Sequence, residues 1–173
     1  MATCLFAFAD EVHYITASQF RDRIFDYRTE REWKYKGDKP CVIDFYTTWC
    51  GPCKRLAPIM EELSQTYCDQ VVFYKADTER EQELAYVFNI SSIPQVLYIP
   101  MHGKPMLLKG LYPKDEIIHI IDEFLLNAPP AEPPAGHVED PGAPKETVEA
   151  PLPEKKSLWQ RWMDKLKYRK NKK

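Results

Sequence analysis

Two cysteines, Cys50 and Cys53, are separated by two residues and stand between an apolar run and a helical pattern. Cysteines at this spacing, directly before a helix, are typical of a redox-active pair that alternates between a dithiol and a disulfide. Cys50 would sit at the helix N-terminus, where free backbone N–H groups favour the thiolate, so we expect it to be the nucleophile. Cys53, one turn further on, would attack a mixed disulfide formed at Cys50 and so resolve it.

A zinc half-site is the alternative interpretation of two cysteines at this spacing. Two thiolates do not complete a tetrahedral site, so a second pair of ligands would be needed. The four histidines do not supply one, because they stand singly at His13, His102, His119 and His137. We therefore expect no metal at the cysteine pair.

The hydrophobic pattern around the cysteines predicts alternating helices and strands. Thr16 and Gln19 form a capping-box pattern at the start of the first helix. The last two predicted strands flank His102 and Gly103 and are expected to form an antiparallel hairpin. This order of elements predicts an α/β fold with a central mixed β-sheet and helices on both faces. The predicted helices lie near 16–27, 56–67, 84–88 and 117–125, and the predicted strands at 42–46, 71–74, 95–99 and 105–109.

Asp44 interrupts the apolar strand that leads to the cysteine pair. A charged, unpaired carboxylate inside a buried strand costs several kcal/mol, so we expect the pKa of Asp44 to be raised. Such a group suits a proton acceptor for Cys53 during resolution. Lys75, in the next strand, is the charge that would moderate Asp44. The alternative is an aspartate on an edge strand that faces water.

The chain has five cysteines, and the other three are scattered at Cys4, Cys41 and Cys68. An odd and dispersed set is not a disulfide framework. We expect Cys41 and Cys68 to be small, half-buried thiols.

Composition changes sharply along the 173 residues. Residues 1–9 are apolar and end in Ala7-Phe8-Ala9, which fits either a signal-peptide remnant or an N-terminal strand. Residues 10–127 have the pattern of one globular domain. Residues 128–154 are rich in proline and glutamate and are expected to be a disordered linker. Residues 155–173 carry nine Lys or Arg and one acid, on a pattern that predicts a basic amphipathic helix.

The basic segment 155–173 suggests a partner of its own. An anionic membrane surface fits its basic and apolar faces, and a protein partner, non-specific nucleic acid or no partner are the alternatives. We expect no specific nucleic-acid binding. With no complete signal peptide the default location is the cytoplasm, whereas the Ala7-Phe8-Ala9 stretch would favour the periplasm or cell envelope.

The run Trp49-Cys50-Gly51-Pro52-Cys53-Lys54 resembles the active-site signature of the thioredoxin family, in its bacterial type with a C-terminal extension. The resemblance covers about residues 10–127. It implies the thioredoxin fold, with Asp44 and Lys75 as the family's buried acid and lysine. Pro58 falls where the family's active-site helix carries a proline.

The resemblance also implies a substrate-binding surface. Ser92-Ile93-Pro94 is similar to the family's cis-proline loop, whose backbone would pair with an extended substrate segment. Gly110 looks like the glycine of the same surface, which would also include Trp49, Gly51 and Pro52. Gln95 departs from the family pattern, in which threonine usually follows the proline.

The implied function is reduction of protein disulfides by a monomer that needs no cofactor. Its partners would be disulfide-containing proteins and an upstream thiol reductant. The Gly51-Pro52 pair favours a reductant, because these residues help to set the potential in this family. A cell-envelope isomerase or thiol-relay protein is an alternative, and a non-catalytic binding module localised by the basic tail is another.

Overall fold

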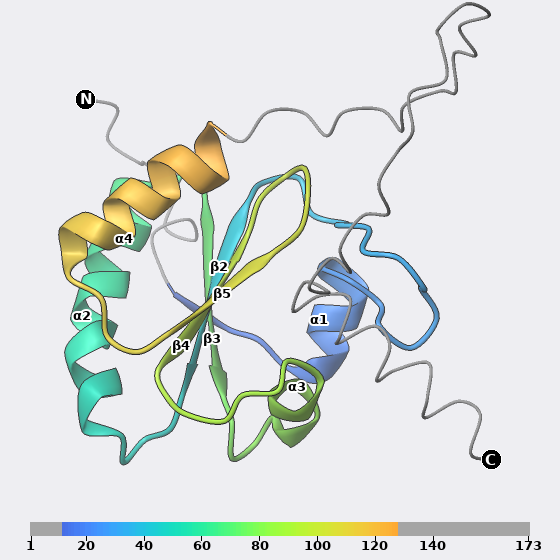
Figure 1. Cartoon of the computed structure of the whole chain (residues 1–173), viewed down its shortest axis with the longest axis horizontal. Helices are drawn as coiled ribbons and strands as arrows, with labels where there is room; N and C mark the ends of the chain where they lie inside the picture. Colours follow the sequence, from blue (N-terminus) through green and yellow to red (C-terminus); the bar gives the residue numbers. More distant parts are fainter. Residues whose placement is uncertain (1–11, 128–173) are drawn as a thin grey trace, which may run out of the picture. The chain divides into compact units, whose positions relative to one another are not determined.

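Five strands form one mixed sheet in the computed structural model, which describes residues 12–127 (Figure 1). Their order across the sheet is β1-β3-β2-β4-β5. β1 and β2 both run parallel to β3, whereas β4 is antiparallel to β2 and to β5. The strands are β1 (His13–Tyr14), β2 (Cys41–Tyr46), β3 (Val72–Asp77), β4 (Gln95–Ile99) and β5 (Met106–Lys109).

β2 lies in the middle of the sheet, and its first five residues are buried. Because both faces of the strand are covered, its sequence is almost continuously apolar and does not alternate. The predicted hairpin is confirmed, since β4 and β5 pair from Gln95 with Lys109 to Tyr98 with Met106.

Helices cover both faces of the sheet, as the sequence predicts. Figure 1 shows α2 and α4 on one side and α1 and α3 on the other. The helices are α1 (Ala17–Arg23), α2 (Gly51–Thr66), α3 (Gln82–Val87) and α4 (Lys114–Ile120), and α4 continues into a π-helical turn, η1 (Ile121–Leu126).

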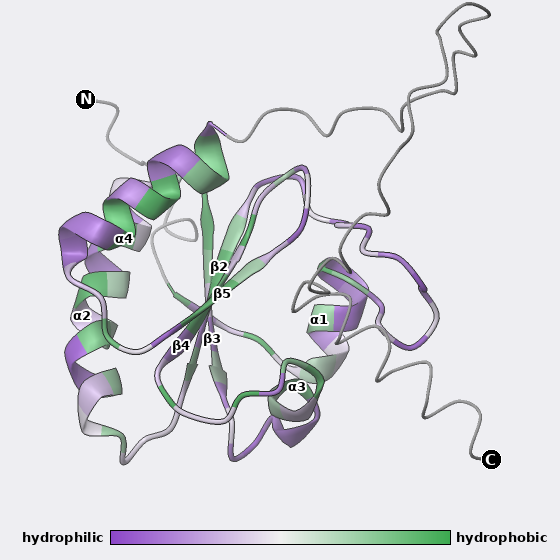
Figure 2. Ribbon diagram, in the orientation of Figure 1, coloured by the Kyte–Doolittle hydropathy of each residue, from purple (hydrophilic) through white to green (hydrophobic). Residues whose placement is uncertain are grey.

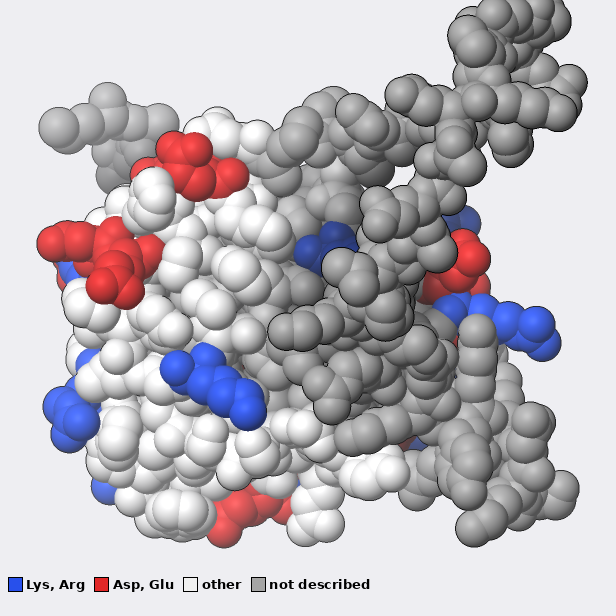
Figure 3. Space-filling model, in the orientation of Figure 1, with Lys and Arg blue, Asp and Glu red and all other residues white. Residues whose placement is uncertain are grey.

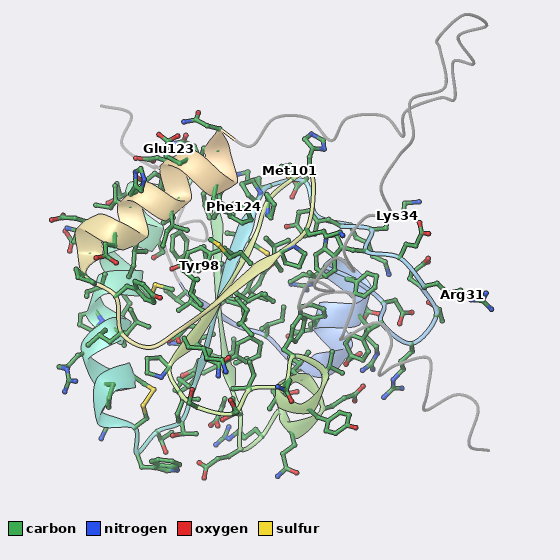
Figure 4. The ribbon with its side chains drawn as sticks, viewed as in Figure 1. Arg31, Lys34, Tyr98, Met101, Glu123 and Phe124 are labelled. Atoms are coloured by element: carbon green, nitrogen blue, oxygen red, sulfur yellow. A yellow bond between two sulfur atoms is a disulfide. The ribbon has the colours of Figure 1, made fainter. Side chains whose placement is uncertain are left out.

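The core on the α2 and α4 side joins the sheet to both helices. Leu56 and Met60 of α2 and Ile117 of α4 pack with Val42 and Val96 of the sheet. Figure 2 shows apolar residues along the strands and mixed stripes on the helices, which is typical of helices with one buried face. In Figure 4, the side chains of Tyr98 from β4 and Phe124 from η1 occupy the space between the sheet and the last helix.

The capping box at the start of α1 is confirmed. The Gln19 backbone N–H donates to Thr16 Oγ1, and the Thr16 N–H donates to Gln19 Oε1. The predicted helix is too long, however, because α1 ends at Arg23 and Tyr27 lies beyond it. Tyr27 is nevertheless buried, with its ring against Phe20 and its hydroxyl donating to Glu83 of α3.

Three further features differ from the sequence predictions. β1 has no counterpart among the predicted strands, because a two-residue strand is too short to show a period. Cys68 is buried but disulfide-bonded, so the expectation of a free thiol there is wrong. No cysteine stands at a short spacing from Cys68 in the sequence, so no local pattern predicts a disulfide there. Cys41 is a free thiol, fully buried rather than half-buried.

Three predictions lie outside the described residues. They concern the apolar start at 1–9, the linker at 128–154 and the basic helix at 155–173, and they stay predictions. Among residues 12–127, no helix combines the length and the apolar character needed to cross a membrane.

Candidate active site

Cys50 and Cys53 lie where β2 leads into α2. Cys50 is the N-cap residue of α2, in an extended backbone conformation, and Cys53 is in the first turn. The two sulfur atoms form a disulfide, with the Cα atoms 5.3 Å apart. The backbone N–H of Cys53 donates to Cys50 Sγ at 3.2 Å. The cap and the first turn of α2 therefore bring the two sulfur atoms within bonding distance of each other.

The start of α2 is suited to hold a thiolate at Cys50 when the disulfide is open. The Cys53 N–H already points at the sulfur, and the helix dipole places partial positive charge at this end. No acidic residue stands in the first turn of α2 to oppose a negative charge. Both effects favour the charged form of a thiol at this position.

Asp44 is buried in the centre of the sheet, with only 5% of its surface exposed. Burial raises the pKa of Asp44 to about 7, and the charge of Lys75 opposes this rise. Asp44 Oδ1 is buried without a hydrogen-bond partner. The alternative of an edge-strand aspartate facing water is excluded, because β2 has β3 and β4 on either side.

The Ile93–Pro94 peptide bond is cis, as the resemblance implies. Pro94 immediately precedes β4, and Gln95 pairs with Phe45 of β2. This register places the cis bond at the end of the sheet where β2 leads to the cysteine pair. The Gly110 N–H donates to the Pro94 carbonyl at 2.9 Å, so the glycine lies beside the loop. Gly110 has a φ of +99°, which a side chain would strain.

Trp49 is two-thirds exposed, and its indole N–H donates to Glu79 Oε1 at 3.0 Å. This bond holds a large apolar surface next to Cys50. Leu111, after Gly110, is a second exposed apolar side chain, 38% exposed. The sequence reasoning missed both Glu79 and Leu111. Glu79 follows β3 in a turn, and no local pattern connects it with a tryptophan thirty positions earlier.

Gln95, the departure from the family pattern, is fully buried. Its side-chain amide donates to the Ser92 carbonyl at 2.8 Å and to Ser92 Oγ at 3.2 Å. Gln95 therefore supports the loop before the cis bond from inside. Within residues 12–127, no group of three His, Cys, Asp or Glu side chains is arranged to hold a metal ion.

The thioredoxin family model matches residues 12–123, which include the cysteine pair, Asp44, Lys75 and the cis-proline loop. The chain belongs to the thioredoxin family. A thioredoxin of Borreliella burgdorferi is 43% identical over 110 residues, which span 64% of this chain and 94% of that protein. The chloroplastic M-type thioredoxin of Spinacia oleracea is 33% identical over 55% of this chain, and the match spans about half of its length, 52%.

A solved structure agrees with these matches. A thioredoxin of Malassezia sympodialis superposes with a TM-score of 0.53 at 30% identity, over 65% of this chain and 90% of that one. The thioredoxin fold expected from the sequence is thus confirmed. With its Cys50–Cys53 pair, this member of the family is a thiol–disulfide reductase that acts on disulfide-containing substrates and is reduced by a reductase.

Proposed function

We propose that Cys50 begins each cycle by attacking a disulfide in a substrate protein. The Cys50 thiolate forms a bond to one substrate sulfur, and the other substrate sulfur leaves as a thiolate that takes up a proton. The observation that carries this assignment is the position of Cys50 as N-cap of α2, with the Cys53 N–H directed at its sulfur. Cys50 and Cys53 are both buried, so the position at the helix N-terminus, and not exposure, distinguishes them.

Cys53 completes the cycle. Its thiol gives its proton to the Asp44 carboxylate, and the resulting thiolate attacks Cys50 Sγ and breaks the bond between Cys50 and the substrate. The second substrate sulfur leaves as a thiolate that takes a proton from solvent, and Asp44 returns its proton to solvent. The substrate gains two electrons and two protons, and the Cys50–Cys53 disulfide closes. Since the pKa of Asp44 is about 7, this group exchanges a proton readily at neutral pH. An upstream thiol reductant then reopens the disulfide.

The substrate segment lies, in this proposal, against the backbone at Ile93 and Pro94, next to Gly110 and Trp49. The hydrogen bond between Gly110 and Pro94 and the exposed Trp49 ring support such a surface. On the face in Figure 3, acidic and basic side chains are dispersed among neutral ones. At the proposed surface itself, the exposed apolar side chains of Trp49 and Leu111 and the backbone at Pro94 would contribute most of the binding, through contacts that tolerate many sequences.

Insulin reduction tests the two cysteine roles. The wild type should accelerate precipitation of the insulin B chain, and Cys50→Ser should be inactive. Cys53→Ser should hold the substrate as a mixed disulfide on Cys50, visible as an added mass under non-reducing conditions. An inactive wild type with a native fold would support a binding module instead. The assigned roles would be reversed if Cys50→Ser held the substrate on Cys53 while Cys53→Ser held none on Cys50.

We further propose, from composition alone, that residues 155–173 bind an anionic membrane surface. Their nine Lys or Arg residues and their apolar side with Trp159 and Trp162 support this assignment. A membrane-bound tail would concentrate the domain near its substrates or its reductant.

A further inference from the structure

Three residues form a row across three neighbouring strands. Tyr14 of β1 pairs in register with Lys75 of β3, and Lys75 pairs with Asp44 of β2. Side chains in register on parallel strands point to the same face of a sheet. The three side chains therefore share the face that also carries Val12 and Val42 and is covered by α2.

Lys75 stands between an aromatic ring and a carboxyl group, and its ammonium lies over the ring. Lys75 Nζ is 4.5 Å from the centroid of the Tyr14 ring. Among the ion pairs of residues 12–127, none joins Lys75 to Asp44. One oxygen of Asp44 has no hydrogen-bond partner at all. The lysine thus contacts the ring although an unpaired buried carboxyl lies on the adjacent strand.

The titratable groups that interact electrostatically with Asp44 come from the two neighbouring strands, β3 and β4. β4 contributes Tyr98, whose own pKa is raised by burial and by the charge of Asp44. α2 packs on the same face of the sheet and carries Cys53, which does not titrate while the disulfide is closed. Lys75 is the cation whose charge acts on Asp44, and so its position governs the proton affinity of that carboxyl.

We propose that Tyr14 is a positioning residue, whose ring holds the Lys75 ammonium away from Asp44 and so keeps Asp44 free to exchange a proton with Cys53. This inference rests on the proton-acceptor role proposed above for Asp44. The ring attracts the ammonium by a cation–π contact. The buried Asp44 carboxylate attracts the same ammonium when it is charged, so the ring and the carboxylate compete for it. Without the ring, the ammonium is expected to move toward Asp44.

The hydroxyl and the ring of Tyr14 can be separated by mutation. Besides carrying the ring, Tyr14 takes part in a hydrogen bond with Tyr46, which adds to burial in raising the pKa of Tyr46 to about 12. Tyr14→Phe removes this bond and keeps the ring, whereas Tyr14→Leu removes both. Tyr14 is 67% exposed, so neither change leaves a cavity in the core.

Carbon-13 NMR titration of the Asp44 carboxyl in the oxidised full-length chain tests the inference directly. Tyr14→Leu should lower the Asp44 midpoint by about half a pH unit or more. Tyr14→Phe should leave the midpoint close to that of the wild type. In a Lys75→Met background, in which no ammonium remains to be released, Tyr14→Leu should cause no further shift.

Three results would overturn the inference. The first is a Tyr14→Leu midpoint equal to or above that of the wild type. The second is a Tyr14→Phe variant that behaves like Tyr14→Leu, because the hydroxyl would then be responsible. The third is an equal shift with and without Lys75. The titration measures the Asp44 midpoint without any turnover. A failure of the proposed proton-acceptor role would be seen in a different experiment, as an unchanged rate of disulfide reduction by Asp44→Asn.

Discussion

At the scale of single residues, the proposed proton transfer to Asp44 comes at the expense of the stability of the domain. A carboxyl group in the middle of a sheet loses its hydration, and Asp44 has one oxygen without a hydrogen bond in return. Burial therefore favours the protonated form and raises the pKa of Asp44 to about 7 from its ordinary value of 3.8. The folded state binds a proton more tightly than the unfolded chain does.

This difference predicts a pH-dependent stability. The favourable contribution of protonated Asp44 is fully present below about pH 4 and is lost as the pH rises to about 7. Relative to the wild type, Asp44→Asn should gain roughly 2–4 kcal/mol of unfolding free energy between pH 4 and pH 8. Urea denaturation of the oxidised proteins at several pH values measures this gain. Asp69→Asn, at an exposed position, is the control and should show no such gain.

Parallel stability curves for Asp44→Asn and the wild type would show that Asp44 titrates normally in the folded state. The proposed proton transfer from Cys53 would then lose its physical basis.

Some site residues can be predicted from the sequence, and others cannot. Asp44 is recognisable because a lone acid in an apolar run has few explanations, and Cys50 and Cys53 because their spacing is local. Tyr14 and Glu79 are not recognisable. Their roles depend on partners on other elements, Lys75 and Trp49, which only the fold brings near.

At the scale of elements, the ends of the helices are well specified by local chemistry. α2 begins with Cys50 as its cap, and α1 begins with a reciprocal capping box. The N-terminus of α1 is also tied to the rest of the domain, because the Ala17 N–H donates to Glu81 Oε2 at 2.8 Å. The sequence reveals the capping box but not the contribution of Glu81, which lies sixty-four positions away.

Loss of the cap should weaken the domain without affecting the cysteine chemistry. Thr16→Ala leaves the Gln19 N–H without its acceptor and should cost about 1 kcal/mol of unfolding free energy. Ser18→Ala, at an exposed position in the same helix, is the matched control and should change stability little. Equal urea midpoints for Thr16→Ala and the wild type would contradict the role assigned to the cap.

The strands show where sequence patterns stop being informative. β2 and β4 can be predicted, because they are buried runs of five or six residues. β1 cannot, because two residues carry no period, yet its pairing with β3 brings Tyr14 beside Lys75. A short edge strand can thus matter to the site more than its length suggests.

At the scale of the whole molecule, a family domain is combined with segments that the family match does not cover. The match ends at residue 123, and the basic segment at 155–173 lies well beyond it. The domain specifies the reaction, and the flanking segments are the natural candidates for deciding where it takes place.

Vesicle flotation tests the proposed membrane contact of the tail. The full chain should float with vesicles that contain anionic lipid and should be released at high salt, because screening weakens charge attraction. A chain truncated after residue 154 should stay in the soluble fraction, and neutral vesicles are the control. Equal flotation of both chains would exclude the tail as the anchor.

The potential of the Cys50–Cys53 couple tests the central claim, that this dithiol is a reductant of protein disulfides. The couple can be equilibrated with thiol buffers of known potential and read by alkylation and mass. Family membership and the Gly51-Pro52 pair predict a value near about −270 mV, the thioredoxin level. A value above about −180 mV, the level of an isomerase, would contradict the account.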